Sequence, residues 1–81
     1  MPIRKRGTLP TKEESLCLQK VGRKIGQFAA KRGVSIERLA YEGEVSKGYL
    51  YDVVKGKGNP SLTILMRIAT ALEIPITALL K

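Results

Sequence analysis

Apolar residues recur at helical spacing along residues 12–32 and predict one long amphipathic helix. Four of them follow one another at intervals of three and four and share one face: Leu18, Val21, Ile25 and Phe28. Thr11-Lys-Glu-Glu14 matches a capping box, which predicts that the helix starts at Lys12. Gly33 is suited to end it, because glycine readily adopts the left-handed backbone of a helix C-cap.

Two glycines, Gly22 and Gly26, lie four residues apart inside this helix. Each costs roughly 1 kcal/mol relative to alanine in a helix interior. They indicate a place where another helix, or a phosphate group, comes close to the backbone. Simple tolerance of glycine is the alternative.

The next stretch, residues 35–55, predicts two short helices separated by a tight turn. Ser35 and Ser46 can cap them, because a serine oxygen accepts the unpaired amide donors of a first turn. Gly43 supplies the break between them. The apolar positions fall on one side of each helix: Leu39 and Ala40 on the first, and Leu50, Val53 and Val54 on the second. Helices this short need a core made elsewhere, which leaves the outer face of the second helix free for binding.

A fourth helix is predicted after the loop that ends at the capping residue Ser61. Its expected inner face consists of Leu62, Leu65, Ile68, Ala69 and Leu72. A short last element covers residues 75–80 and is unusually apolar through Ile74, Ile76, Leu79 and Leu80. Those four residues form a candidate dimerisation surface, with closure of the core as the equal alternative. The predicted fold class is all-α, a compact five-helix domain over residues 12–81, with a helix-turn-helix unit at residues 36–55.

The net charge of +8 on 81 residues favours a polyanionic partner, nucleic acid first and an anionic membrane second. A basic surface that serves solubility alone is the alternative. Beyond Lys57 the only basic residues are Arg67 and Lys81, so the positive charge belongs to the first two-thirds of the chain. Arg4, Lys5 and Arg6 lie in a predicted flexible basic arm at residues 1–11, which either follows DNA or is a solvated tail.

One cysteine, Cys17, and no histidine leave too few ligands for a metal site built on these residues and permit no internal disulfide. We therefore expect no metal and no cofactor. A lone cysteine suits a reducing compartment. No apolar run approaches the ~20 residues of a membrane helix, and no signal-peptide region begins the chain. We expect a cytoplasmic protein that does not span a membrane, although residues 12–32 could instead form a basic surface helix on one.

The outer face of the second short helix carries chemistry suited to DNA. The candidate DNA-binding residues are Ser46, Lys47, Gly48, Tyr49, Tyr51, Asp52, Lys55, Lys57 and Asn59. A lysine can donate to guanine O6 and N7 or to phosphate, and Asp52 can accept from cytosine N4. Ser46 and the free amides near it can hold a phosphate, and the amides of Gly58 and Asn59 offer a second phosphate contact. Tyr49 lies at the flank, where it contacts DNA or packs inward.

Several segments together resemble the Cro and phage-repressor family of helix-turn-helix proteins, also called Xre-type. The resemblance rests on the order and spacing of 21–25, 33–35, 39–40, 45–46, 56–62 and 68–74. It implies a lambda-repressor-like domain of five helices, DNA binding through residues 47–55 and a homodimer on a two-fold related site. Three positions depart from the family pattern: Ile36 replaces a usual glutamine, Glu44 replaces the turn glycine, and Val54 replaces a frequent glutamate.

These observations predict a sequence-specific, double-stranded-DNA-binding transcription regulator, a repressor or a restriction–modification controller, acting as a homodimer on a palindromic operator. The rival is an antitoxin-type module that neutralises a partner toxin and regulates its own synthesis. An enzyme is not expected, because the chain has no Ser-His-Asp set and Gly56-Lys-Gly-Asn does not match a Walker phosphate loop.

Overall fold

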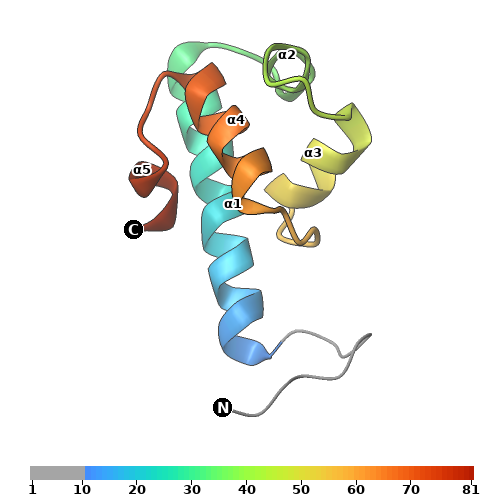
Figure 1. Ribbon diagram of the computed structural model, residues 1–81, viewed down its shortest axis with the longest axis vertical. Helices are drawn as coiled ribbons and strands as arrows, with labels where there is room; N and C mark the ends of the chain where they lie inside the picture. Colours follow the sequence, from blue (N-terminus) through green and yellow to red (C-terminus); the bar gives the residue numbers. More distant parts are fainter. Residues whose placement is uncertain (1–10) are drawn as a thin grey trace.

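A computed structural model describes residues 11–81 of the chain, and these residues form five helices. They are α1 (Lys12–Arg32), α2 (Ile36–Glu42), α3 (Lys47–Val54), α4 (Leu62–Leu72) and α5 (Thr77–Leu80). The long helix α1 contacts every other helix, and α3 and α5 lie on different sides of it (Figure 1). All but the last residue of the predicted basic arm lies outside the described residues.

Four helices begin at the capping residues that the sequence predicts. Thr11 forms the full capping box with Glu14 at the start of α1. The hydroxyls of Ser35, Ser46 and Ser61 accept hydrogen bonds at 3.0, 3.4 and 3.2 Å from the third amide of α2, α3 and α4. Each such cap stabilises a helix by ~1 kcal/mol, so the start of every helix near the candidate interface is set locally.

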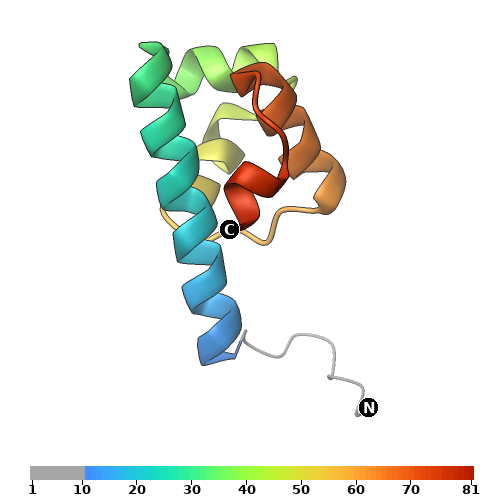
Figure 2. The ribbon, with the colours of Figure 1, turned by 90° about the vertical axis from the view of Figure 1, so that its left-hand side faces the viewer.

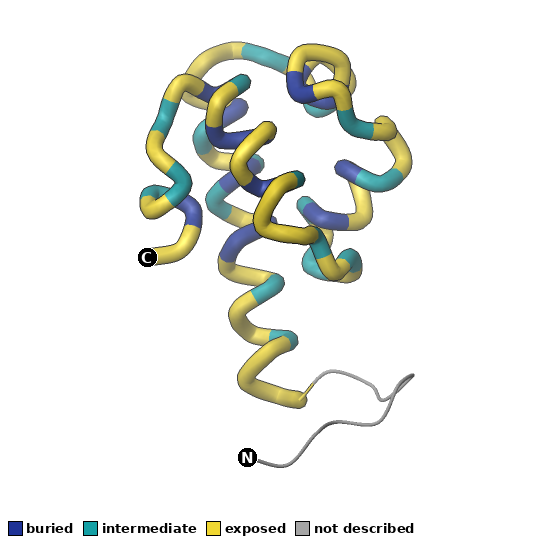
Figure 3. Tube along the Cα trace, viewed as in Figure 1, coloured by how far each residue is buried: buried dark blue, intermediate teal, exposed yellow. Residues whose placement is uncertain are grey.

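The core lies between α1 and the inner faces of the other helices. Its buried apolar residues are Val21, Ile25, Ala29, Leu39, Ala40, Leu50, Val53, Leu65, Ile68, Ala69, Leu72 and Leu79. The N-terminal turns of α1 project beyond this core and are mostly exposed (Figures 2 and 3). One predicted core residue is wrong: Leu62 is 62% exposed, because it stands in the first turn of α4, outside the packed face.

Gly22 is the point at which α3 comes closest to α1. A methyl group on Gly22 would lie 2.3 Å from the carbonyl oxygen of Val53 and 2.6 Å from that of Val54. Close helix approach is therefore confirmed at this position. Gly26 is different, because a methyl group there would lie 3.8 Å from the nearest atom, a side-chain carbon of Val54. The C-terminal end of α3 thus rests directly on the backbone of α1.

Arg32 connects the C-terminal ends of α1 and α4 through two polar contacts. Its guanidinium donates a 2.8 Å hydrogen bond to the carbonyl of Ala71 and forms a 3.2 Å ion pair with Glu73. Glu73 ends α4 in the left-handed conformation, with φ of 60°. Gly33 ends α1 in the same way, with φ of 70°, as the sequence predicts.

Candidate nucleic-acid interface

The turn between α2 and α3 is built around a left-handed glutamate. Glu44 has φ of 56°, whereas the preceding Gly43 has φ of −85°, which any residue adopts. The displaced glycine therefore serves packing rather than the turn itself. Gly43 is buried, and a methyl group there would lie 3.2 Å from the carbonyl oxygen of Leu39 and 3.6 Å from that of Arg67. Glu44 thus takes the left-handed conformation at the position of the family's turn glycine, and the tightest neighbour of Gly43 is the carbonyl oxygen of Leu39 within α2.

Helix α3 divides into a buried face and an exposed face, as its sequence predicts. Leu50 is fully buried and Val53 is 2% exposed, so both hold the helix on the core. The predicted outward residues are exposed: Ser46, Lys47, Gly48, Tyr51, Asp52 and Lys55. Tyr49 is half-buried and packs against the core, which is the second of the two positions expected for it from the sequence. The exposed face is polar, and it combines cations, one carboxylate and one aromatic ring.

The loop that follows α3 folds back onto the helix and onto α1. Gly56 has φ of 80°, and a methyl group on it would lie 2.8 Å from Cγ of Gln19. The amide of Lys57 donates to the carbonyl of Asp52 at 2.9 Å, and the amide of Gly58 donates to the same oxygen at 3.4 Å. The Gly58 amide is thus engaged within the chain, which corrects the expectation that it offers a phosphate contact. The side chains of Lys57 and Asn59 are exposed.

An ion pair joins the first turns of α2 and α3. Nζ of Lys47 lies 3.5 Å from Oε2 of Glu37, and both side chains are about 60% exposed. Within residues 11–81, neither Lys55 nor Lys57 takes part in an ion pair, and the carboxylate of Asp52 has no hydrogen-bond partner. The Lys47–Glu37 pair could not be predicted from the sequence, because the two residues are ten apart and meet only through the angle of the turn.

The family glutamine contact at the start of α2 has no equivalent in this chain. Ile36 occupies that position, and its side chain is half-buried against the core. An aliphatic side chain cannot donate a hydrogen bond to phosphate. A phosphate contact at this end of the unit would have to come from another residue, and Ser46 is exposed at the start of α3.

The four predicted dimerisation residues do not share one environment. Leu79 is fully buried in the core, so its assignment to a dimer surface is corrected: its side chain has no surface to offer a partner. Ile74 and Ile76 are half-buried and pack against the core. Leu80 is 47% exposed and belongs to α5, which lies on the other side of α1 from α3 (Figure 1).

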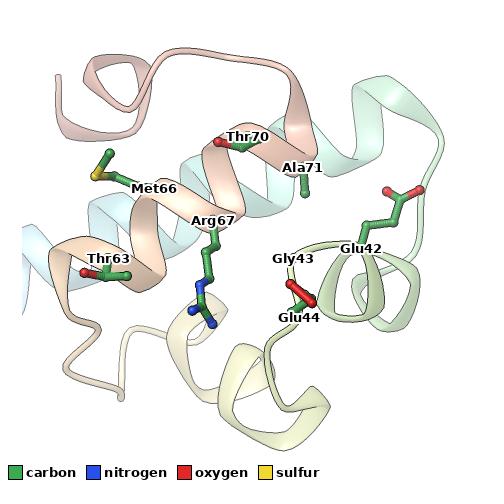
Figure 4. A pocket seen from close by; sticks show the side chains of 8 residues that line it. All are labelled: Glu42, Gly43, Glu44, Thr63, Met66, Arg67, Thr70 and Ala71. Carbon is green, nitrogen blue, oxygen red and sulfur yellow. The ribbon is translucent and has the colours of Figure 1, made fainter.

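A shallow groove of about 490 Å³ separates the α2–α3 turn from α4 (Figure 4). Its lining residues are Glu42, Gly43, Glu44, Thr63, Met66, Arg67, Thr70 and Ala71. None of the predicted DNA-binding residues lines this groove. Within residues 11–81, no cluster of three potential metal ligands occurs. No helix in that range could span a membrane. Of the apolar stripe of α1, Val21 and Ile25 are buried in the core and Phe28 packs against it, whereas Leu18 is half-buried.

Residues 25–79 match the model of the family described as helix-turn-helix, which is more than half of the chain. The match confirms the family resemblance and the all-α fold class. The transcriptional regulator SlrR of Bacillus subtilis is 38% identical over 60 residues, which cover 73% of this chain. They cover 40% of SlrR, so the match extends over less than half the length of that relative.

Solved structures with similar sequences share the same helical arrangement. The restriction–modification controller protein C.AhdI of Aeromonas hydrophila is 32% identical, with a TM-score of 0.75 over 76% of this chain and 94% of its own. The N-terminal DNA-binding domain of SinR from Bacillus subtilis is 28% identical, with a TM-score of 0.74 over 78% of this chain and 93% of its own. These relatives are regulators or DNA-binding domains, not enzymes.

Proposed function

Because the chain belongs to the helix-turn-helix family, we propose that it is a transcription regulator that binds double-stranded DNA in a sequence-specific way. Helix α3 enters the major groove, as the second helix of such a unit does. The observation that carries this proposal is the exposed polar face of α3, held on α1 at Gly22. A helix fixed at its buried side can present side chains to base edges without a large ordering cost on binding.

The residues of this interface divide into anchors and readers. Lys55 and Lys57 hold phosphate, since they carry charge that no carboxylate in the described part of the chain neutralises. Ser46 lies at the start of α3, where free amides and the helix dipole favour phosphate, and Asn59 adds an exposed donor. The readers are Lys47, Tyr51 and Asp52, of which Lys47 suits guanine and Asp52 suits cytosine.

The regulator acts as a homodimer on a palindromic operator, as a repressor or a restriction–modification controller in the cytoplasm. Two-fold symmetry places two α3 helices about one helical turn of DNA apart. Leu80, with the half-buried Ile74 and Ile76, offers an apolar surface away from α3 on which a second copy can pack. The similarity to the controller C.AhdI supports the role of a restriction–modification controller.

Selection of bound duplexes from a random pool tests this proposal. The expected result is an enriched palindrome whose half-sites are about one helical turn apart. A binding stoichiometry of two chains per duplex, measured by sedimentation, tests the dimer separately. Recovery of duplexes without any common sequence would overturn the proposed reader, and one chain per palindrome would overturn the dimer.

A further inference from the structure

The ion pair between Lys47 and Glu37 has a consequence for how α3 selects DNA. Resting on the proposed function, we propose that Glu37 is a positioning residue for specificity: it keeps Lys47 from acting as a phosphate anchor and reserves it for base edges. Glu37 stands in the first turn of α2, and Lys47 is the first residue of α3. The ion pair therefore connects the N-terminal ends of the two helices, next to the free amides of α3.

Pairing changes the range over which Lys47 attracts DNA. An isolated ammonium attracts every phosphate within a Debye length, which is about 10 Å at 0.1 M salt. A carboxylate at 3.5 Å from Nζ cancels most of that long-range attraction. The hydrogen bonds that remain are short-range: Nζ has three donors, of which Glu37 occupies one. The two free donors act only where acceptors such as guanine O6 and N7 lie in contact.

Departure of Lys47 to a phosphate is also opposed by Glu37 itself. If Nζ moved to the DNA backbone, the Glu37 carboxylate would lose its partner while standing close to a polyanion. Within residues 11–81, Lys55 and Lys57 lack such a partner. The three lysines at this surface therefore differ in their electrostatic setting, and the difference assigns base readout to Lys47 and phosphate anchoring to the other two.

Glu37→Gln tests the inference, with Glu42→Gln as the matched control. Both variants remove one negative charge from an exposed carboxylate of α2, but Glu42 pairs with Arg38 on the same helix, at 3.2 Å. Dissociation constants are measured by fluorescence anisotropy for the selected duplex and for a scrambled duplex, between 50 and 300 mM KCl. Circular dichroism checks that each variant is folded.

We expect Glu37→Gln to tighten binding to the scrambled duplex and to steepen its log–log salt dependence by about 0.9, the increment for one added phosphate contact. The ratio of the two dissociation constants should fall about fivefold, the lower end of what one base contact contributes. Glu42→Gln should leave that ratio unchanged. In a Lys47→Ala background, Glu37→Gln should no longer change the ratio.

An equal effect of Glu37→Gln and Glu42→Gln on the ratio would overturn the inference, because it would reduce Glu37 to a general contribution to net charge. Persistence of the Glu37→Gln effect in Lys47→Ala would overturn it as well. A wild-type protein that prefers no duplex over the scrambled one would instead overturn the proposed function, and the inference with it.

Discussion

Replacement of Gly22 by alanine is the most direct probe of how α1 supports α3. The new methyl group would lie 2.3 Å from the carbonyl oxygen of Val53. Carbon and oxygen in contact lie about 3.3 Å apart, so α3 would have to withdraw by roughly 1 Å. Overpacking a core in this way costs up to about 3 kcal/mol, whereas alanine gains ~1 kcal/mol over glycine in a helix. The expected net loss of unfolding free energy is about 2 kcal/mol.

Urea denaturation followed by circular dichroism measures this loss, and Gly26→Ala is its control. Gly26 stands one turn further along α1, where the nearest atom to an added methyl group lies 3.8 Å away. The unfolding free energy of this variant should rise by about 0.5–1 kcal/mol, because alanine favours the helix more than glycine and its methyl group clashes with nothing. Since about 1 kcal/mol moves the melting temperature of a small domain by 4–8 °C, the two variants should differ clearly. A Gly22→Ala protein as stable as Gly26→Ala would refute the close approach of α3 to α1.

Three further substitutions test the turn, the core and the C-terminal surface. Glu44→Gly should raise the unfolding free energy by about 0.5–1 kcal/mol in urea titrations. Glycine removes the left-handed strain, and its greater freedom in the unfolded chain offsets only part of that gain. A loss of stability would contradict the strain. Leu79→Ala should cost 2–5 kcal/mol in the same titration, as expected for a fully buried leucine. Leu80→Ser should change stability by less than about 1 kcal/mol but shift sedimentation from dimer to monomer; an unchanged dimer would exclude Leu80 from the subunit interface.

Local signals in the sequence were enough to predict most of the fold. The caps at Thr11, Ser35, Ser46 and Ser61 involve residues three apart, so the pattern of side chains contains the whole interaction. The same holds for the two faces of α3, because helical spacing alone decides which residues point together. The strain at Glu44 was also predictable, since the family pattern has glycine there.

Interactions between helices could not be predicted in this way. The Lys47–Glu37 pair depends on the angle between α2 and α3, and the contact of Arg32 with Ala71 joins residues 39 apart. Helical spacing also could not divide the apolar C-terminus into a buried Leu79 and an exposed Leu80. These features follow from the way the helices pack, which no single stretch of sequence contains.

The proposed function depends most on contact between the exposed face of α3 and DNA. The measurement that tests it most directly is the dissociation constant of Lys47→Ala and Lys55→Ala for the selected duplex, with Lys31→Ala as control. Lys31 is an exposed cation in the last turn of α1, outside the candidate interface. Both α3-face variants should weaken binding by ~1–3 kcal/mol, at least fivefold, whereas Lys31→Ala should have a smaller effect. Equal affinities for all three variants would contradict contact between this face and DNA.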